Sequence, residues 1–195
     1  MTIAEITSIV RSITNEYSQK NRDIFFYEGN RVFELGENNI IAPLVAVSIN
    51  NVELGSSGAW SYNSTTNKLT FENSVTLTTD YIITVDYNYY PNFSDTEIKE
   101  YIKSAIVHIS LNGYSTFTYD STLNIINPET TSIQGNLIAM IASILMKPNN
   151  KTYRLPDITI QVPGTTLSTD EMIRKTIAVF KRNTHGVFSL VGGFE

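Results

Sequence analysis

The sequence predicts an α+β fold in which a helical bundle domain carries an inserted small antiparallel β-sandwich or barrel module. Two observations lead to this fold class. Apolar residues recur at helical spacing near the N-terminus and again after Pro91, whereas residues 24–90 follow a period of two. Within residues 24–90, short strands alternate with turn signals about every 8–12 residues, as in small antiparallel sheets. We therefore expect residues 1–23 and 93–186 to form the helical domain, residues 24–90 the β module and residues 187–195 a C-terminal interface tail.

A first helix is expected over residues 2–20. Thr2 and Glu5 have the spacing of a capping box, in which each side chain binds the backbone N–H of the other residue. Six apolar residues follow at helical intervals, namely Ile3, Ile6, Ile9, Val10, Ile13 and Tyr17. An isolated helix of this length is marginal in water, so we expect it to pack on the later helices.

Three turns organise the predicted β module. Gly29–Asn30 is a two-residue hairpin signal, Asn50–Asn51 is a second one, and residues 63–67 form a third turn. The last strand alternates, so that one face should lie in the core and carries Tyr81, Ile83, Val85, Tyr87 and Tyr89. The expected strands cover residues 24–27, 32–35, 45–49, 52–54, 59–62, 68–71, 74–77 and 81–90.

Three helices are expected after the β module. Each begins at a pair of residues with capping-box spacing, namely Ser94 and Glu97, Thr131 and Gln134, and Ser168 and Glu171. The second of these helices runs to Met146 and is apolar nearly all round, which predicts a place at the centre of the helical core. Between the helices, residues 114–126 should be extended and residues 158–162 should form a short strand. The last helix should end at Gly186.

Composition excludes several classes of protein. The 195 residues include no cysteine, which rules out a disulfide framework, thiolate metal sites and cysteine catalysis. A net charge of −5 and a pI near 5.1 argue against a protein whose main work is to bind phosphate backbones. Most of this charge lies in residues 24–93, which hold two basic and seven acidic residues. No stretch approaches the roughly 20 apolar residues of a membrane span, so we expect a protein kept or assembled in the cytoplasm.

The sequence contains no recognisable catalytic, cofactor or metal site. Its two histidines, His108 and His185, have no partners at metal-ligand spacing, and a boundary position and a helix-capping role explain them. There is no nucleophile elbow, no phosphate-binding loop and no dinucleotide fingerprint. An acid–base pair of carboxylates in the β module stays open, although a solvent-facing acidic surface explains these residues better. We expect no enzyme activity and no cofactor.

The strand and helix around Pro91 resemble a known protein family. Tyr87-Asn88-Tyr89-Tyr90-Pro91-Asn92-Phe93-Ser94-Asp95-Thr96-Glu97-Ile98-Lys99-Glu100-Tyr101-Ile102 is similar to the tyrosine-rich strand and helix start of head-to-tail connector proteins of tailed bacteriophages, also called adaptor, neck or head-completion proteins. The apolar helices and the extended tail that follow are also similar to this family. Residues 49–54 through 67–71 resemble β insertions of phage structural proteins.

The resemblance implies a structural virion protein without chemistry of its own. Copies would form a homo-oligomeric ring, usually a dodecamer in this family, which joins the portal protein to the tail or to a second neck protein. DNA would pass through the ring without specific binding, and an acidic channel wall would repel it. The protein would be assembled in the host cytoplasm, reside at the head–tail junction of the virion and contact no membrane.

Two other functions remain open. The first is a tail, baseplate or receptor-binding component, in which the β module binds a glycan or protein through Trp60 and nearby tyrosines, although a core position also suits Trp60. The second is a cellular enzyme, which the missing constellations make the weakest alternative. The tail carries four large apolar residues, Phe188, Leu190, Val191 and Phe194, which we expect at an interface with a neighbouring subunit or the portal. Folding back over its own helical core is the alternative for this tail.

Overall fold

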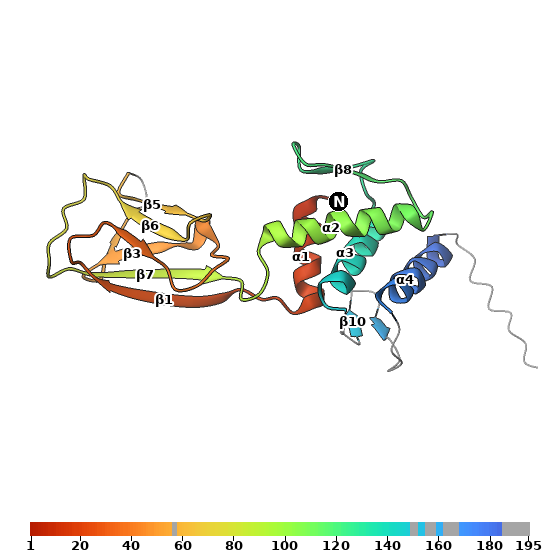
Figure 1. Cartoon of the computed structure of the whole chain (residues 1–195), viewed down its shortest axis with the longest axis horizontal. Helices are drawn as coiled ribbons and strands as arrows, with labels where there is room; N and C mark the ends of the chain where they lie inside the picture. The colour runs from red at the N-terminus through yellow and green to blue at the C-terminus, as the bar shows by residue number, and fades with distance from the viewer. Residues whose placement is uncertain (56–57, 149–151, 155–158, 162–167, 185–195) are drawn as a thin grey trace, which may run out of the picture. The chain divides into compact units, whose positions relative to one another are not determined.

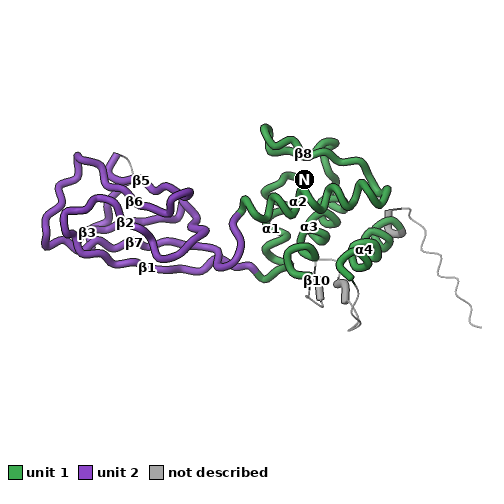
Figure 2. Tube along the Cα trace, viewed as in Figure 1, with its two compact units in different colours: residues 1–15, 95–195 green, residues 16–94 purple. Residues whose placement is uncertain are grey.

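The computed structural model describes residues 1–55, 58–148, 152–154, 159–161 and 168–184 (Figure 1). The chain divides into two compact units, which Figure 2 shows in different colours. Unit 1 consists of Met1–Asn15 and Asp95–Glu195, and unit 2 consists of Glu16–Ser94. Residues 16–23, which we expected to belong with the helices, therefore lie in unit 2.

The expected fold class, a helical bundle with an inserted β-sandwich or barrel, is wrong. The chain is α+β, but among the described residues the strands outnumber the α-helices, with eleven strands against four α-helices. Unit 1 itself contains two antiparallel hairpins beside its helices, so it is not a plain helical bundle. These strands have three residues each, and only the one within residues 158–162 was predicted as a strand.

The most apolar of the four α-helices of unit 1 lies between the other three. The helices are α1 (Ile3–Thr14), α2 (Asp95–Leu111), α3 (Ser132–Met146) and α4 (Thr169–Thr184). Helix α3 contacts each of the other three and is buried nearly all round, which confirms its predicted central place. The capping boxes predicted at Thr2, Thr131 and Ser168 are also confirmed by the hydrogen bonds at the starts of α1, α3 and α4.

Helix α1 is shorter than expected. It ends at Thr14 because Asn15 adopts a left-handed conformation with φ of 53°, a geometry that terminates helices. Tyr17, predicted on the buried face of this helix, lies beyond its end and is 64% exposed. The chain then enters a strand at Gln19, so the prediction of a helix to residue 20 is wrong.

Two hairpins complete the described part of unit 1. One consists of β8 (Thr118–Asp120) and β9 (Ile125–Asn127), and the other of β10 (Thr152–Arg154) and β11 (Thr159–Gln161). Strands β8, β9 and β11 fall within or beside segments predicted to be extended, whereas β10 was not predicted. The peptide bond between Asn127 and Pro128, after β9, is cis.

Unit 2 is built from two antiparallel sheets. The four-stranded sheet has the order β1-β7-β3-β4, and the three-stranded sheet has the order β2-β6-β5. The strands are β1 (Gln19–Phe26), β2 (Val32–Glu34), β3 (Ala46–Ile49), β4 (Val52–Leu54), β5 (Trp60–Asn63), β6 (Lys68–Phe71) and β7 (Ile82–Tyr89). A short 3-10 helix, η1 (Ala42–Leu44), precedes β3.

Two of the three predicted turns of unit 2 are confirmed. Asn50 and Asn51 have positive φ values of 49° and 66° and join β3 to β4, and residues 63–67 join β5 to β6. The predicted hairpin at Gly29–Asn30 is wrong, because β1 pairs with β7 while β2 pairs with β6 in the other sheet. Residues 74–77 form no strand, although Val75 and Leu77 pack against the core.

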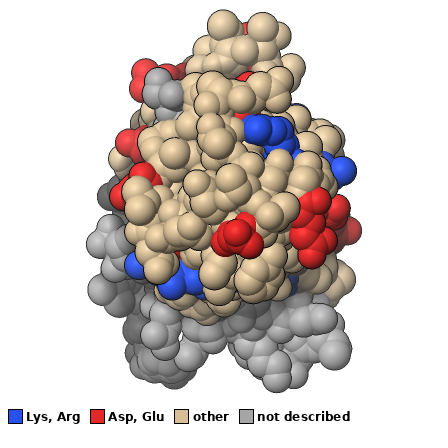
Figure 3. All heavy atoms as spheres, turned by 90° about the vertical axis from the view of Figure 1, so that its left-hand side faces the viewer, with Lys and Arg blue, Asp and Glu red and all other residues tan. Residues whose placement is uncertain are grey.

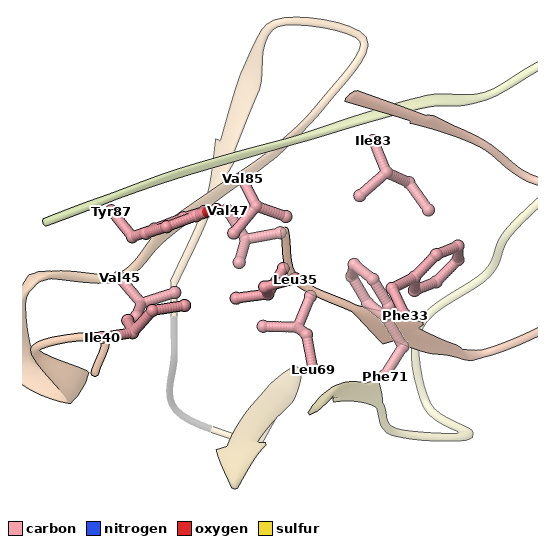
Figure 4. Close-up of a cluster of buried hydrophobic side chains, with 10 residues drawn as sticks. All are labelled: Phe33, Leu35, Ile40, Val45, Val47, Leu69, Phe71, Ile83, Val85 and Tyr87. Atoms are coloured by element: carbon pink, nitrogen blue, oxygen red, sulfur yellow. The ribbon is translucent and has the colours of Figure 1, made fainter. Parts of the chain in front are cut away.

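The core of unit 2 lies between its two sheets. Figure 4 shows the ten residues of this core, Phe33, Leu35, Ile40, Val45, Val47, Leu69, Phe71, Ile83, Val85 and Tyr87. The rings of Phe33 and Phe71 meet edge to face with centroids 5.8 Å apart. Ile83, Val85 and Tyr87 are buried as the alternation of β7 predicted, and Tyr89 is partly buried against them.

Candidate functional site

Trp60 is the one predicted interface residue that lies in the described part of the chain. It begins β5, is half-buried against the core of unit 2, and donates a hydrogen bond from Nε1 to the carbonyl oxygen of Leu54 at 3.2 Å. The other predicted interface residues, Phe188, Leu190, Val191 and Phe194, lie outside the described residues. The interface role of all five residues stays a prediction.

The two histidines lie apart in the sequence, and only one of them is described. His108 is half-buried on α2, and its carbonyl oxygen accepts hydrogen bonds from the backbone N–H and the Nδ2 of Asn112 at 3.1 and 2.8 Å. These contacts close the C-terminal turn of α2. His185 lies outside the described residues.

The outer face of the four-stranded sheet carries an apolar patch that the sequence analysis did not single out. Ile24 and Phe26 on β1 are 56% and 67% exposed, and Ile82 on β7 is 42% exposed. Phe26 lies directly opposite Ile82, and Ile24, two residues before Phe26, points to the same face. We call Ile24, Phe26 and Ile82 the outer apolar patch. Contiguous exposed apolar side chains of this kind mark interaction sites.

Next to the outer apolar patch lies an ion pair across β1 and β7. Arg22 donates from Nε and Nη2 to the two carboxylate oxygens of Asp86, at 2.7 and 3.1 Å. This hydrogen bonding, reinforced by the charge of Asp86, raises the pKa of the Arg22 guanidinium above its usual value. Lys20 follows on the same exposed face of β1. The face therefore combines an apolar end with a charged end.

The inner face of β1 contributes a polar network to the edge of the core. The Tyr87 hydroxyl donates to Asp23 Oδ2 at 2.8 Å and accepts from Asn21 Nδ2 at 2.9 Å. Asp23 Oδ2 also accepts from the backbone N–H of Gly36 at 2.7 Å. Burial, followed by the hydrogen bond to Asp23, raises the pKa of Tyr87 to about 12. The network fixes the loop after β2 to the four-stranded sheet, which is a structural role.

A buried carboxylate joins the two ends of unit 2. Glu16 is 2% exposed, and its Oε1 accepts hydrogen bonds from the backbone N–H groups of Asn92 and Phe93 at 2.8 and 3.3 Å. The side-chain amide of Asn92 also donates to Glu16 Oε2 at 2.9 Å. Several N–H groups donate to this one carboxylate and stabilise its charge, so the contact has a structural role.

Unit 1 presents apolar side chains on α2. Val107 and Leu111 lie four residues apart on one side of this helix and are 55% and 79% exposed. On the same side, Lys103 forms an ion pair with Glu100 and lies 5.0 Å from the ring centre of Tyr119. The unit also has an open hollow of about 670 Å³ lined by Met1, Thr2, Glu5, Ser8, Ile9, Glu129 and Ser132.

Acidic and histidine side chains form no metal-binding cluster in the described part of the chain. Among the described residues, no three His, Asp or Glu side chains are grouped so that they could hold a metal ion. Figure 3 shows one face of the molecule, which is mostly uncharged and carries acidic groups in separate places. Within the described ranges, no helix is long and apolar enough to cross a membrane.

No known protein family matches the chain, and no curated protein sequence is detectably similar to it.

Proposed function

We propose that the chain is a structural protein of a tailed-phage virion, which forms a ring between the portal and the tail and lines the DNA channel. The proposal begins with the resemblance of residues 87–102 to connector proteins of tailed phages. Its support from the structure is the apolar surface that both units expose. Unit 2 exposes the outer apolar patch, and unit 1 exposes Val107 and Leu111.

Exposed apolar surface on two separate units suits a protein that is permanently assembled. A protein with a single partner needs one such surface, whereas a ring subunit between two other rings contacts copies of itself and other proteins. Burial of a large apolar side chain contributes roughly 1.5–3 kcal/mol before ordering costs are subtracted. Repeated around a ring, even a few such side chains per subunit stabilise a long-lived assembly.

Electrostatics is consistent with the proposed channel. Unit 2 contains nine acidic and four basic residues, which gives it a net charge of −5. On the face of the molecule that Figure 3 shows, acidic groups lie in separate places. A dispersed negative surface repels the phosphates of DNA without binding a sequence or a particular site.

A glycan-binding role for unit 2 has less support. The indole N–H of Trp60 is already bound to Leu54, and its ring is half-buried, so little of the ring remains for stacking on a sugar. We therefore place the connector function above the receptor-binding one.

The test is the state of assembly, measured by native mass spectrometry and negative-stain electron microscopy. We expect a closed ring, either of the chain alone or after addition of the portal protein from the same phage. A chain that stays monomeric at every concentration, and that also fails to bind the portal, would overturn the proposal. A trimer that binds glycans would favour the receptor-binding alternative.

A further inference from the structure

The four-stranded sheet of unit 2 has two open edges. Strand β1 forms one edge and β4 forms the other, and within the described ranges no further strand pairs with either of them. Open edges offer unpaired N–H and C=O groups, and many proteins use such edges to pair with another chain. Strand β1 is eight residues long, whereas β4 has three residues.

On β1, the backbone groups that face the open edge belong to the residues with outward side chains. Tyr27 donates its N–H to Tyr81 across the β1–β7 pair at 3.0 Å. Backbone hydrogen bonding in an antiparallel ladder alternates, so the odd-numbered residues of β1 bind β7. The N–H and C=O groups of Lys20, Arg22, Ile24 and Phe26 therefore point to the open edge, and their side chains lie on the outer face.

On β4, the same reasoning singles out Glu53. The two-residue turn at Asn50–Asn51 closes on a hydrogen-bonded pair, Ile49 and Val52, so the backbone of Glu53 points away from β3. Glu53 pairs with Ser48, which in turn pairs with Thr84, and Thr84 lies opposite Ile24. The exposed side chain of Glu53 therefore lies on the same outer face as the side chains of Lys20 and Arg22.

The two edges carry opposite charges on that face. The edge at β1 presents Lys20 and Arg22, and the edge at β4 presents Glu53. A guanidinium has five N–H donors, and Arg22 uses two of its own to bind Asp86. The remaining donors of Arg22 can bind a second carboxylate beside Asp86.

Strand direction favours contact between the two edges of successive copies. In a sheet of four antiparallel strands, the first and the last strand run in opposite directions. When such a sheet is repeated head to tail, β4 of one copy meets β1 of the next copy in antiparallel orientation. Without any stagger, Glu53 would face Ile24 of the next copy, and a stagger of two residues places it opposite Arg22. Staggered pairing is also what lets a continuous sheet curve and close.

We propose that β4 of one copy pairs with β1 of a second copy of this chain, with Glu53 opposite Arg22, so that the four-stranded sheets of successive subunits become continuous. The contact joins different surfaces of two copies, and contacts of this kind generate rings or filaments. The inference rests on the proposed function, because it names the surface through which ring subunits bind one another. This contact would also place the outer apolar patch beside the joined edges.

Disulfide cross-linking tests this pairing directly, because the natural chain has no cysteine. The test variant carries Arg22→Cys and Glu53→Cys. Directly paired residues that are hydrogen bonded lie about 5.5 Å apart at Cα, which a disulfide can bridge. Within one chain, three strand spacings of roughly 4.8 Å separate the two positions, so they cannot form a disulfide. We expect a ladder of dimers, trimers and larger species under mild oxidation and denaturing, non-reducing electrophoresis.

Matched controls decide what the ladder means. Each single-cysteine variant should run as a monomer on the denaturing gel. Arg22→Cys combined with Ser48→Cys should also run as a monomer, because Ser48 points to the same face of the sheet but lies on an inner strand. No cross-linking of the test variant above these controls would overturn the proposal. Dimers from Arg22→Cys alone would also overturn it, because they would show that two β1 edges meet around a two-fold axis.

A second variant separates this inference from the proposed function. We expect Glu53→Lys to raise the protein concentration needed for half-assembly about tenfold or more, since it sets like charges against Arg22 and Lys20. Circular dichroism should show that the variant is folded. If the natural chain forms rings by native mass spectrometry while neither the cross-link nor the charge reversal has an effect, the proposed function stands and the edge contact is wrong. If the chain forms neither rings nor cross-linked species, both proposals fail.

Discussion

Replacement of Tyr87 by phenylalanine removes one hydroxyl that takes part in three hydrogen bonds within unit 2. The ring is 2% exposed and stays in the core, so the change tests the hydrogen bonds and leaves the packing in place. The hydroxyl donates to Asp23 and accepts from Asn21, and the backbone N–H of Glu37 donates to it at 3.3 Å. After the replacement, Asp23 retains the N–H of Gly36 as a donor.

The expected loss of stability is about 1.5–3 kcal/mol, which is the usual contribution of a hydrogen bond to a charged group. The bond to the Asp23 carboxylate supplies most of it, because the contact with Glu37 is long and Asn21 is half-exposed. Tyr89→Phe is the matched control. Tyr89 lies two residues further along β7, and among the described residues its hydroxyl binds the exposed Gln19 side chain at 3.1 Å, so we expect a loss of about 0.5 kcal/mol or less.

Urea unfolding followed by tryptophan fluorescence measures both variants. Trp60 is the single tryptophan of the chain and packs on the core of unit 2, so its emission reports the unfolding of this unit. If Tyr87→Phe and Tyr89→Phe are equally stable, the network around Asp23 contributes nothing and the reasoning is refuted.

The dependence of stability on alkaline pH gives a second, independent test of the contribution of Tyr87. Its pKa is about 12 in the folded protein against 10 for an ordinary tyrosine, so the unfolded chain loses this proton first. The resulting stability is fully present below pH 10 and is lost between pH 10 and 12. The full difference corresponds to at most ~2.7 kcal/mol, and we expect ~1 kcal/mol because the hydroxyl is only partly buried. The difference in free energy of unfolding between the natural chain and Tyr87→Phe should therefore fall by ~1 kcal/mol between pH 10 and 12.

Three further changes test other parts of the fold and the tail. Glu16→Ala leaves the donors of Asn92 and Phe93 without their acceptor and should cost about 2–4 kcal/mol in urea unfolding, whereas Glu16→Gln keeps one oxygen and should cost less. Thr7→Val replaces a buried hydroxyl that has no partner in the described part of the chain, so thermal unfolding should show no loss or a gain of up to about 1 kcal/mol. Deletion of residues 187–195 should leave the melting temperature unchanged and abolish binding to the ring or portal, and a lower melting temperature of the monomer would assign the tail to its own helical core.

Local signals in the sequence predicted the elements that depend on near neighbours. Capping pairs located the starts of α1, α3 and α4, because each pair acts over three residues. The Asn50–Asn51 turn was predictable for a similar reason, since asparagine tolerates the positive φ that such a turn requires. The burial of Ile83, Val85 and Tyr87 followed from simple alternation along β7.

The errors concern partners that are distant in the sequence. Gly29 does adopt a positive φ of 93°, but the strands on either side of it separate into different sheets, and β1 pairs with a strand more than fifty residues away. Strand pairing is decided by packing of the whole core, which turn residues alone do not encode. The surfaces proposed for assembly were missed for the same reason, because Arg22 and Glu53 become edge residues only through the strand order.

Two contacts, one in each unit, join the two chain segments at which the chain passes from one unit to the other. In unit 1, Arg11 of α1 forms an ion pair with Asp95 at the start of α2. In unit 2, Glu16 binds the backbone of Asn92 and Phe93. Units made from separated segments require chain ends that lie close together, and these charged contacts hold them there. These hydrogen bonds explain why a side chain as polar as Glu16 is buried. Its carboxylate accepts them from the segment that leads back to the helices.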